Sequence, residues 1–128
     1  MAKTKGLVIK ERTVGESDRL VTLLTADYGL VNAFVRNAKQ LKNKLSASTS
    51  LFAYCEFSIY QGRDANVVDN ATVIEMFFDL RSDIEKLAVA QYFAQLAYEL
   101  ANEGQPEEEM LSIILNSLHL LCKGEKSI

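Results

Sequence analysis

The chain has 128 residues, of which 48% are hydrophobic and 24% are charged, so it can bury a core and is not a disordered chain. No apolar run reaches the roughly 18 residues that span a bilayer, so no transmembrane segment is expected. The net charge of −3, taken over the whole chain, argues against a nucleic-acid partner.

Three β-rich runs occupy residues 6–14, 19–25 and 30–36. Turn-forming residues separate them at 15–18 and 27–29. Short strands that are joined by tight turns predict an antiparallel meander in the first third of the chain.

Residues 51–60 form the clearest strand, because apolar side chains alternate with aromatic and polar ones. The predicted core face holds Leu51, Ala53, Cys55, Phe57 and Ile59. The opposite face holds Phe52, Tyr54, Glu56, Ser58 and Tyr60. A fifth strand is expected over residues 66–77, where the alternation slips at Asp69 and Asn70 and predicts a bulge.

Beyond residue 78 the periodicity changes to that of a helix. Ser82 and Glu85 match a capping box and predict a helix with Ser82 as its N-cap. Gly104 suits the end of this helix, and Pro106 suits the first turn of a second helix. The residues expected on the apolar side of the first helix are Leu80, Ile84, Leu87, Ala88, Phe93, Leu96 and Leu100.

The second predicted helix, over residues 106–122, is apolar around most of its circumference. Nine of the thirteen residues from 110 to 122 are apolar, which is wider than one amphipathic stripe. We therefore expect the native protein to continue past Ile128 and to cover this helix with later helices. The 128-residue fragment is expected to self-associate, or to fray in this helix. The side chains expected to mediate self-association are Ile113, Ile114, Leu118 and Leu121.

Five short strands with a long connection at about residues 37–49 fit the partly open five-stranded barrel of the OB-fold. An SH3-like barrel fits the strand count nearly as well, so the pattern alone leaves both open. The expected class is mainly β followed by α. The expected units are a barrel over residues 1–79 and the start of a truncated helical domain over residues 80–128.

Charge is distributed unevenly along the chain. Residues 1–80 carry ten Lys or Arg against nine Asp or Glu, whereas residues 81–128 carry four against eight. No acid occurs between Asp27 and Glu56. The cations of that interval are Arg36, Lys39, Lys42 and Lys44. Because phosphate binding depends on the field at one surface, this local pattern favours a nucleic-acid contact.

Several segments occur in an order and at a spacing that point to one family. They are residues 3–9, 15–25 and 28–30, the basic stretch 36–45, residues 51–62 and residues 75–77. Together they resemble the RecO family of bacterial recombination mediators, over nearly the whole chain from about Lys3 to about Leu121. No single segment is highly specific; the order and spacing carry the resemblance.

The resemblance implies an N-terminal OB-fold followed by a helical domain, often with a four-cysteine zinc site that would lie outside this chain. It also implies a cytoplasmic, nucleoid-associated protein that acts in DNA repair and homologous recombination. Such proteins bind single- and double-stranded DNA, anneal complementary strands, and contact RecR and the single-strand-binding protein. With RecR they help to load RecA onto coated DNA.

The expected DNA-binding residues combine the basic stretch with neighbouring strand ends and aromatics. They are Arg36, Lys39, Lys42, Lys44, Arg19, Arg63, Tyr54 and Tyr60. The cations would neutralise phosphates, and Tyr54, Tyr60 and Phe52 on one strand face would stack bases. Solvated charges and an aromatic face packed against the helices are the alternatives. A second hypothesis for the function is a protein-interaction module that docks RecR or the single-strand-binding protein with little DNA affinity of its own.

No enzyme, metal or cofactor is expected. Two cysteines and one histidine cannot easily supply the four ligands of a structural zinc site. Ser17 and Asp18 suit a turn, and the His119 side chain is expected to be packed or semi-buried within the apolar helix. Cys55 and Cys122 suit the role of small hydrophobic residues, as free thiols in a cytoplasmic protein.

Overall fold

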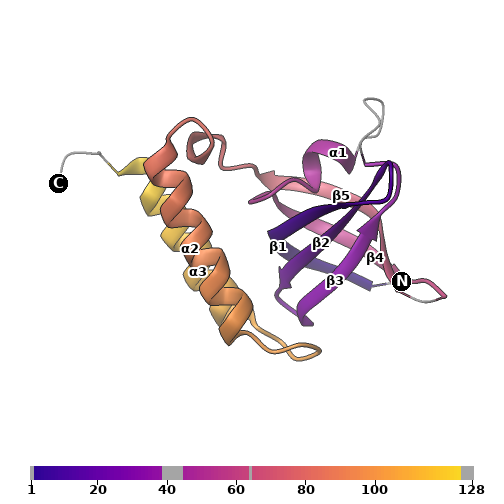
Figure 1. The fold of residues 1–128 in the computed structure, drawn as a ribbon. Helices are drawn as coiled ribbons and strands as arrows, with labels where there is room; N and C mark the ends of the chain where they lie inside the picture. Colours follow the sequence, from indigo (N-terminus) through magenta and orange to yellow (C-terminus); the bar gives the residue numbers. More distant parts are fainter. Residues whose placement is uncertain (1, 39–44, 64, 125–128) are drawn as a thin grey trace.

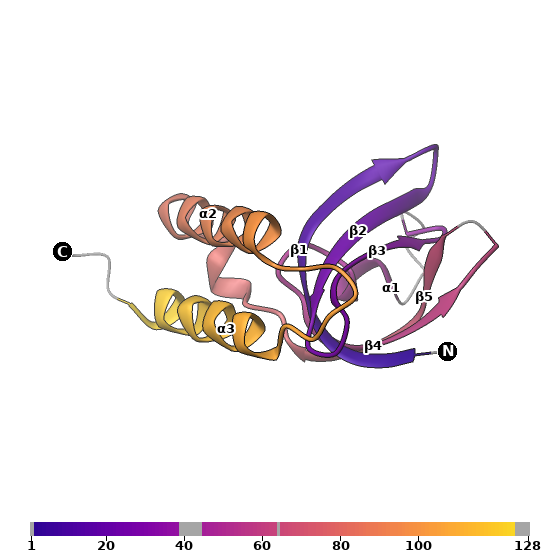
Figure 2. The same cartoon turned by 90° about the horizontal axis from the view of Figure 1, so that it is seen from below.

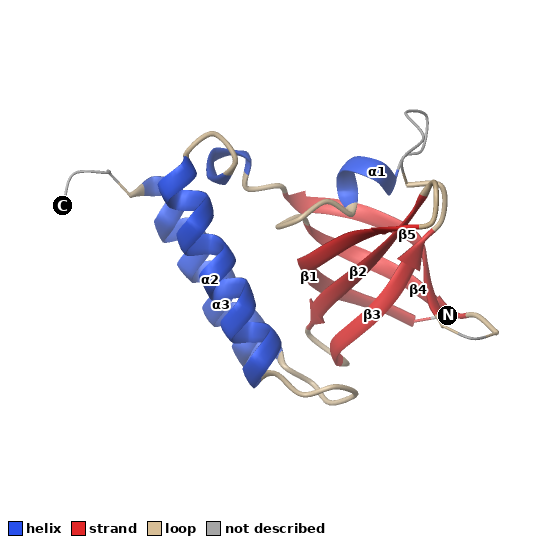
Figure 3. Ribbon diagram, viewed as in Figure 1, coloured by secondary structure: helices blue, strands red, loops and turns tan. Residues whose placement is uncertain are grey.

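The computed structural model describes residues 2–38, 45–63 and 65–124. Within them, a barrel of five strands is followed by two helices that lie side by side along it (Figures 1 and 3). The strands are β1 (Ala2–Val14), β2 (Asp18–Thr25), β3 (Gly29–Val35), β4 (Tyr54–Gln61) and β5 (Asn66–Glu75). The helices are the short α1 (Leu45–Ser48), the 3-10 turn η1 (Phe78–Leu80), α2 (Ile84–Leu100) and α3 (Glu108–Lys123).

The order of the strands around the barrel is β1-β2-β3-β5-β4, and the barrel is closed. β1, β2 and β3 form the predicted antiparallel meander. β5 is parallel to β3 and antiparallel to β4, and β4 pairs with β1 to close the barrel. This Greek-key order is that of the OB-fold, which confirms the predicted class and decides between the two barrels that the sequence pattern left open.

Bulges set which side chains face the barrel interior. Ser58 and Ile59 of β4 pair with Asn70 and Val68 of β5. Asp69 is therefore an extra residue in β5, where the bulge was predicted. In β1, Val8 pairs with Leu23 and Lys10 with Thr22, so Ile9 is an extra residue there. This second bulge puts Lys10 opposite Thr22 instead of on the side of Val8. Before it, ordinary strand alternation gives Leu7 and Ile9 to one hydrophobic cluster and Val8 to the other.

The first cluster fills the barrel and the second joins its outer surface to the helices. The interior cluster consists of Val8, Val21, Leu23, Ala33, Val35, Ala38, Ala53, Cys55, Phe57, Ile59, Val68 and Met76. The helix-facing cluster consists of Leu7, Ile9, Leu24, Phe52, Phe77, Leu80, Ala90, Ala94, Ala97, Leu111, Ile114 and Leu118. Figure 2 shows α2 and α3 as a pair beside β1 and the β2–β3 turn.

The N-cap of α2 is Asp83, one residue after the predicted Ser82. The Asp83 carboxylate accepts hydrogen bonds from the backbone amides of Glu85 and Lys86, at 3.0 and 3.3 Å. Ser82 is instead part of the preceding turn, where its hydroxyl donates to the Asp79 carbonyl oxygen at 3.2 Å. Both residue types are good caps, and the backbone direction selects between them.

The buried side of α2 is a stripe of small residues, Ala90, Ala94 and Ala97. The prediction that Ile84, Ala88 and Leu100 lie on the buried side is wrong: Ile84 and Leu100 are 87% and 64% exposed, and Ala88 is exposed too. Small side chains let α3 and the barrel approach the α2 backbone closely. The two helices run in opposite directions, and the Lys86 ammonium near the start of α2 donates to the Cys122 carbonyl oxygen near the end of α3, at 3.1 Å.

The helical hairpin is also held to the barrel by backbone hydrogen bonds. The amide of Leu30 donates to the Asn102 carbonyl oxygen, Gly104 to Tyr28 and Glu107 to Ala26, at 2.9, 2.8 and 3.0 Å. These bonds join the β2–β3 turn to the α2–α3 connection. Gly29 lies between them with φ +67°.

Apolar side chains remain exposed on the helices. Ile113 and Leu120 are 57% and 72% exposed, whereas Ile114 and Leu118 are 6% and 0% exposed. The predicted self-association surface is therefore wrong for Ile114 and Leu118, which pack in the helix-facing cluster. The exposed apolar residues of the hairpin include Val89, Tyr92, Leu100, Ile113 and Leu120.

We expect the chain to self-associate through this exposed surface, because association removes apolar area from water at about 25 cal/mol per Å². The double variant Ile113→Ser with Leu120→Ser should shift the sedimentation coefficient towards that of a monomer at equal protein concentration. Ser112→Ala with Asn116→Ala on the same helix is the control and should leave association unchanged. A wild-type chain that stays monomeric at every concentration would contradict the expectation.

Candidate nucleic-acid interface

A row of cross-strand neighbours runs around the outer surface of the barrel. The pairings place Arg12 opposite Leu20, Leu20 opposite Phe34, Phe34 opposite Val67, and Val67 opposite Tyr60. Directly paired residues project to the same side of a sheet. Leu20, Phe34, Val67 and Tyr60 are each next in sequence to a residue of the interior cluster, so they face away from the interior. Along the row Arg12 is exposed, Leu20, Phe34 and Tyr60 are half-buried, and Val67 is buried. One guanidinium and two aromatic rings therefore follow one line across all five strands.

A second, shorter row lies beside the first. Lys10 pairs with Thr22, and Thr22 pairs with Asn32, whose side-chain oxygen accepts a hydrogen bond from the Thr22 hydroxyl at 2.7 Å. A hollow of about 420 Å³ lies over these two rows. It is lined by Lys10, Glu11, Arg12, Leu20, Thr22, Asn32 and Tyr98.

The positive charge of this face is only weakly opposed by its one carboxylate. Glu11 accepts a hydrogen bond from the Leu51 amide, and its other oxygen lies 3.5 Å from Nε of Arg19. Its charge is therefore directed towards Arg19 at the end of the barrel. Lys10 and Arg12 leave the face with a net positive charge, as a phosphate-binding surface requires.

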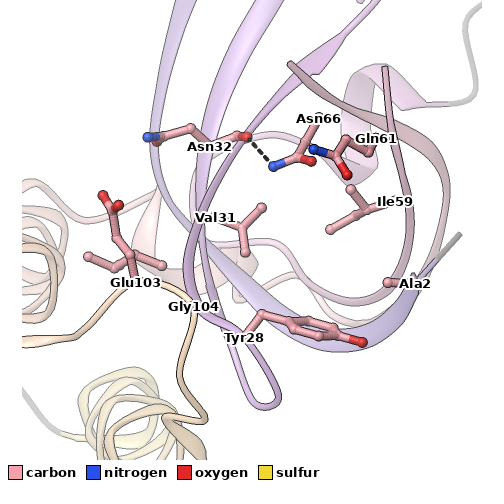
Figure 4. A pocket seen from close by; sticks show the side chains of 10 residues that line it. Ala2, Tyr28, Val31, Asn32, Ile59, Gln61, Asn66, Glu103 and Gly104 are labelled. Atoms are coloured by element: carbon pink, nitrogen blue, oxygen red, sulfur yellow. Dashed lines mark hydrogen bonds between the residues drawn. The ribbon is translucent and has the colours of Figure 1, made fainter. Parts of the chain in front are cut away.

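The β3–β5 side of the closed barrel is joined by only two residue pairs, Ala33–Asn66 and Phe34–Val67, so the two strands diverge beside Asn32. A cavity of about 710 Å³ lies where they diverge (Figure 4). The Asn66 amide group donates to the Asn32 carbonyl oxygen at its edge, at 3.4 Å. The walls combine Tyr28 and apolar side chains with the amides of Gln61 and Asn66. Asn32 is common to this cavity and to the 420 Å³ hollow, so the two are adjacent.

Of the predicted cations, Arg19 has a structural role in the barrel. One of its terminal nitrogens donates to the Ser46 carbonyl oxygen at 2.7 Å and to the Thr49 hydroxyl at 3.0 Å. With the nearby Glu11, these bonds tie β2 to the segment around α1, and the side chain is only 17% exposed. Strand alternation placed Arg19 at a strand end but gave no sign of these partners.

The other predicted cations are divided between two ends of the barrel. Arg36 is exposed directly after β3, and Arg63 is exposed in the β4–β5 turn. The amide of Asn37 donates to the Asp18 carboxylate at 2.9 Å, so the chain leaves β3 beside the β1–β2 turn. Lys39, Lys42 and Lys44 lie outside the described residues.

The three predicted aromatics do not form one platform. Phe52 precedes β4, has φ +70° and is 1% exposed, so it belongs to the helix-facing cluster. Tyr54 is half-buried against the same cluster, and burial raises the pKa of its hydroxyl. Tyr60 lies six residues further along β4, roughly 20 Å away at the rise of a strand. The register instead puts Tyr60 in one row with Phe34, with Val67 between them. Phe34 is not among the predicted DNA-binding residues.

The Cys55 thiol is not activated as a nucleophile. Burial raises the pKa of the Cys55 thiol to about 11, and it donates to the Ser48 carbonyl oxygen. His119 is exposed, contrary to the prediction of a packed or semi-buried side chain, although its ring meets Phe77 edge-on at 4.9 Å. Over the described ranges, no three His, Cys, Asp or Glu side chains lie together as a metal site would need. Nor does any helix described here have the length and hydrophobicity of a membrane span.

The barrel order and the hairpin beside it define an OB-fold protein with an appended helical part. Residues 1–77 match the family model described as "Recombination protein O N terminal", and residues 81–128 match "Recombination protein O C terminal". The chain therefore belongs to the RecO family of DNA repair proteins, as its resemblance predicted.

Proteins named DNA repair protein RecO are similar over nearly the full chain. The protein from Acetivibrio thermocellus is 38% identical over 125 residues, which is 98% of this chain and 50% of that protein. The protein from Caldicellulosiruptor bescii is 36% identical over 125 residues, with 98% and 51% covered. The protein from Alkaliphilus metalliredigens is 31% identical, with the same coverage. The chain thus spans about half the length of these relatives.

Proposed function

We propose that this chain is a non-catalytic DNA-binding and strand-annealing module of a recombination mediator. The observation that carries the proposal is the outward row from Arg12 to Tyr60, with Lys10 beside it and Arg36 and Arg63 at separate ends of the barrel. Cations beside aromatic rings on an OB-fold surface are the combination that holds single strands without regard to sequence.

Binding would begin with the phosphates. Arg12, Lys10 and the basic stretch from Arg36 displace condensed counterions from the strand, which favours binding at low salt. Phe34 and Tyr60 then offer ring faces or edges to the bases, each worth roughly 1–3 kcal/mol where a base stacks. A strand held mainly by its backbone keeps base edges available, so a complementary strand can pair with it. The same charges attract double-stranded DNA.

The proposed setting is the nucleoid of the cytoplasm, with RecR and the single-strand-binding protein as protein partners. A second candidate function is a docking module for these two proteins, with DNA affinity too weak to matter alone. The exposed apolar residues of the hairpin, such as Tyr92 and Leu100, favour it. Salt-dependent DNA binding by the isolated chain distinguishes the two candidates.

Replacing Lys39, Lys42 and Lys44 by alanine should weaken binding to single-stranded DNA equally for different sequences. The slope of log K against log salt should fall by about two, because each phosphate contact contributes roughly 0.7. Fluorescence anisotropy with labelled oligonucleotides at several salt concentrations measures both quantities.

The matched control replaces Lys3, Lys5 and Lys123, which removes the same charge elsewhere. Lys5 lies opposite Glu56, and Lys3 shares a hollow with Glu56 and Asp69, so acids already offset these two charges. The control should bind DNA with a slope close to that of the wild type. Equal loss of slope in both variants would mean that net charge, and not the basic stretch, governs binding.

A further inference from the structure

The hollow over the outer face of the barrel continues onto the helical hairpin. A second hollow, of about 430 Å³, lies between β1 and α2. It shares Lys10, Glu11 and Tyr98 with the 420 Å³ hollow of the barrel face. Figure 1 shows β1 as a strand that faces the helices, which is why one strand borders both hollows.

Tyr98 stands at the boundary between these hollows. It lies in the last turn of α2, and its side chain is 43% exposed. The Lys10 ammonium lies 4.2 Å from the centroid of its ring, at the distance of a cation–π contact. The contact places a positive charge beside an exposed aromatic ring, where the barrel meets the hairpin.

We propose that Tyr98 and Lys10 form a nucleotide subsite, so that single-stranded DNA bound across β1–β3 continues onto α2. This inference rests on the proposed function. A base stacks on the Tyr98 ring, and Lys10 turns its ammonium to the adjoining phosphate. Both contacts are indifferent to sequence, as binding to the barrel face would be.

The groups around the subsite suit a strand that ends there. Gln91 and Gln95 line the second hollow and offer neutral amides to a sugar or a base edge. Glu11 is occupied by the Leu51 amide and Arg19. Glu99 lines the same hollow and accepts a hydrogen bond from Gln95 at 3.3 Å. Its carboxylate repels a further phosphate, so the strand leaves the protein beyond Tyr98.

Tyr92 provides a contrast on the same helix. Its side chain is 62% exposed, more than that of Tyr98. It lines neither of the two hollows that meet at Tyr98. Exposure alone therefore does not distinguish the two tyrosines, whereas position on the DNA path does.

The chain contains no tryptophan, so Tyr98→Trp introduces a single reporter at the subsite. Oligothymidylates of increasing length should quench its fluorescence, and only once they are long enough to cross the barrel face and reach α2. Tyr92→Trp is the matched control and should show no quenching at saturating DNA. Tyr98→Ala should lose roughly tenfold in affinity for long oligothymidylates, the loss expected for one stacked base. For oligothymidylates too short to reach α2, it should bind as well as the wild type.

The outcomes separate the subsite from the proposed function. If the wild type binds oligothymidylate with a salt-dependent affinity, but Trp fluorescence at position 98 is unchanged and Tyr98→Ala binds normally, the subsite is wrong and the proposed function stands. If the wild type binds no single-stranded DNA, both are wrong. Length-dependent quenching confined to position 98 would support the subsite, because a purely structural role of Tyr98 does not produce it.

Discussion

Replacing Gly29 by alanine is expected to lower the free energy of unfolding by roughly 2–5 kcal/mol and to loosen the helical hairpin from the barrel. A Cβ at this position would lie 2.0 Å from the Asn102 carbonyl oxygen and 2.6 Å from that of Gln105. Both are backbone atoms of the α2–α3 connection, which cannot move away without disturbing the hydrogen bonds to Tyr28 and Leu30. The left-handed φ of +67° adds its own penalty for a side chain.

Urea unfolding of both proteins measures this loss, and proteolysis within the α2–α3 connection should become faster. Gly15→Ala is the matched control, because Gly15 has φ +64° but nothing within 4 Å of the added Cβ. Its free energy of unfolding should fall only by the penalty for a side chain at a left-handed φ, about 1 kcal/mol. Equal losses at the two glycines would mean that the close approach at Gly29 contributes nothing.

Phe52→Ala is expected to destabilise the chain by about 3–5 kcal/mol, since it removes a fully buried ring from the helix-facing cluster. The loss should appear in stability and not specifically in DNA affinity. Once allowance is made for the unfolded fraction, the variant should bind oligonucleotides with the salt slope of the wild type.

The control for Phe52 is Phe78→Ala, a ring that is 67% exposed. It should change the free energy of unfolding by less than about 0.5 kcal/mol. Thermal and urea unfolding, followed by circular dichroism, measure both variants. A selective loss of DNA affinity in Phe52→Ala at unchanged stability would restore the original expectation that Phe52 stacks bases.

The strands were predictable because their signals are local. Alternation along residues 51–60 identified the buried Ala53, Cys55, Phe57 and Ile59, and the slip at Asp69 identified the bulge. Such patterns depend only on the pleat of a strand and on which face is buried. The order in which the strands close the barrel depends on long-range pairing. The strand pattern is therefore compatible with an SH3-like barrel as well, and the β3–β5 pairing decides between the two.

Other features depend on backbone geometry or on packing that a single segment does not reveal. Phe52 and Tyr54 share a face, as the alternation predicted, but at this end of β4 that face packs in the helix-facing cluster instead of facing solvent. On α2 the predicted buried side was assigned mainly from large apolar residues, whereas Ala90, Ala94 and Ala97 form the buried side. Close helix packing favours small residues there, and periodicity weighted by hydrophobicity does not identify them.

The candidate interface also combines a feature that is local in sequence with features that depend on long-range pairing. The basic stretch was visible because its cations lie close together in sequence. The outward row takes one residue from each of five strands, at positions 12, 20, 34, 60 and 67, and only the register brings them into line. Arg19 has the right charge and neighbourhood, but its partners Ser46 and Thr49 lie 27 and 30 residues away in sequence.

The burial of β1 on both faces has a consequence for cooperativity. Strand alternation gives Val8 to the barrel interior, while Leu7 and Ile9 contribute to the helix-facing cluster. The two clusters are thus linked through the main chain of one strand, and neither can lose its packing without disturbing β1. We expect the parts matched by separate N- and C-terminal family models to unfold in one transition, with slowly exchanging amides shared between β1, α2 and α3. A mutation in the hairpin would then raise the opening rate of the barrel, and DNA bound across β1–β3 would in turn protect the hairpin.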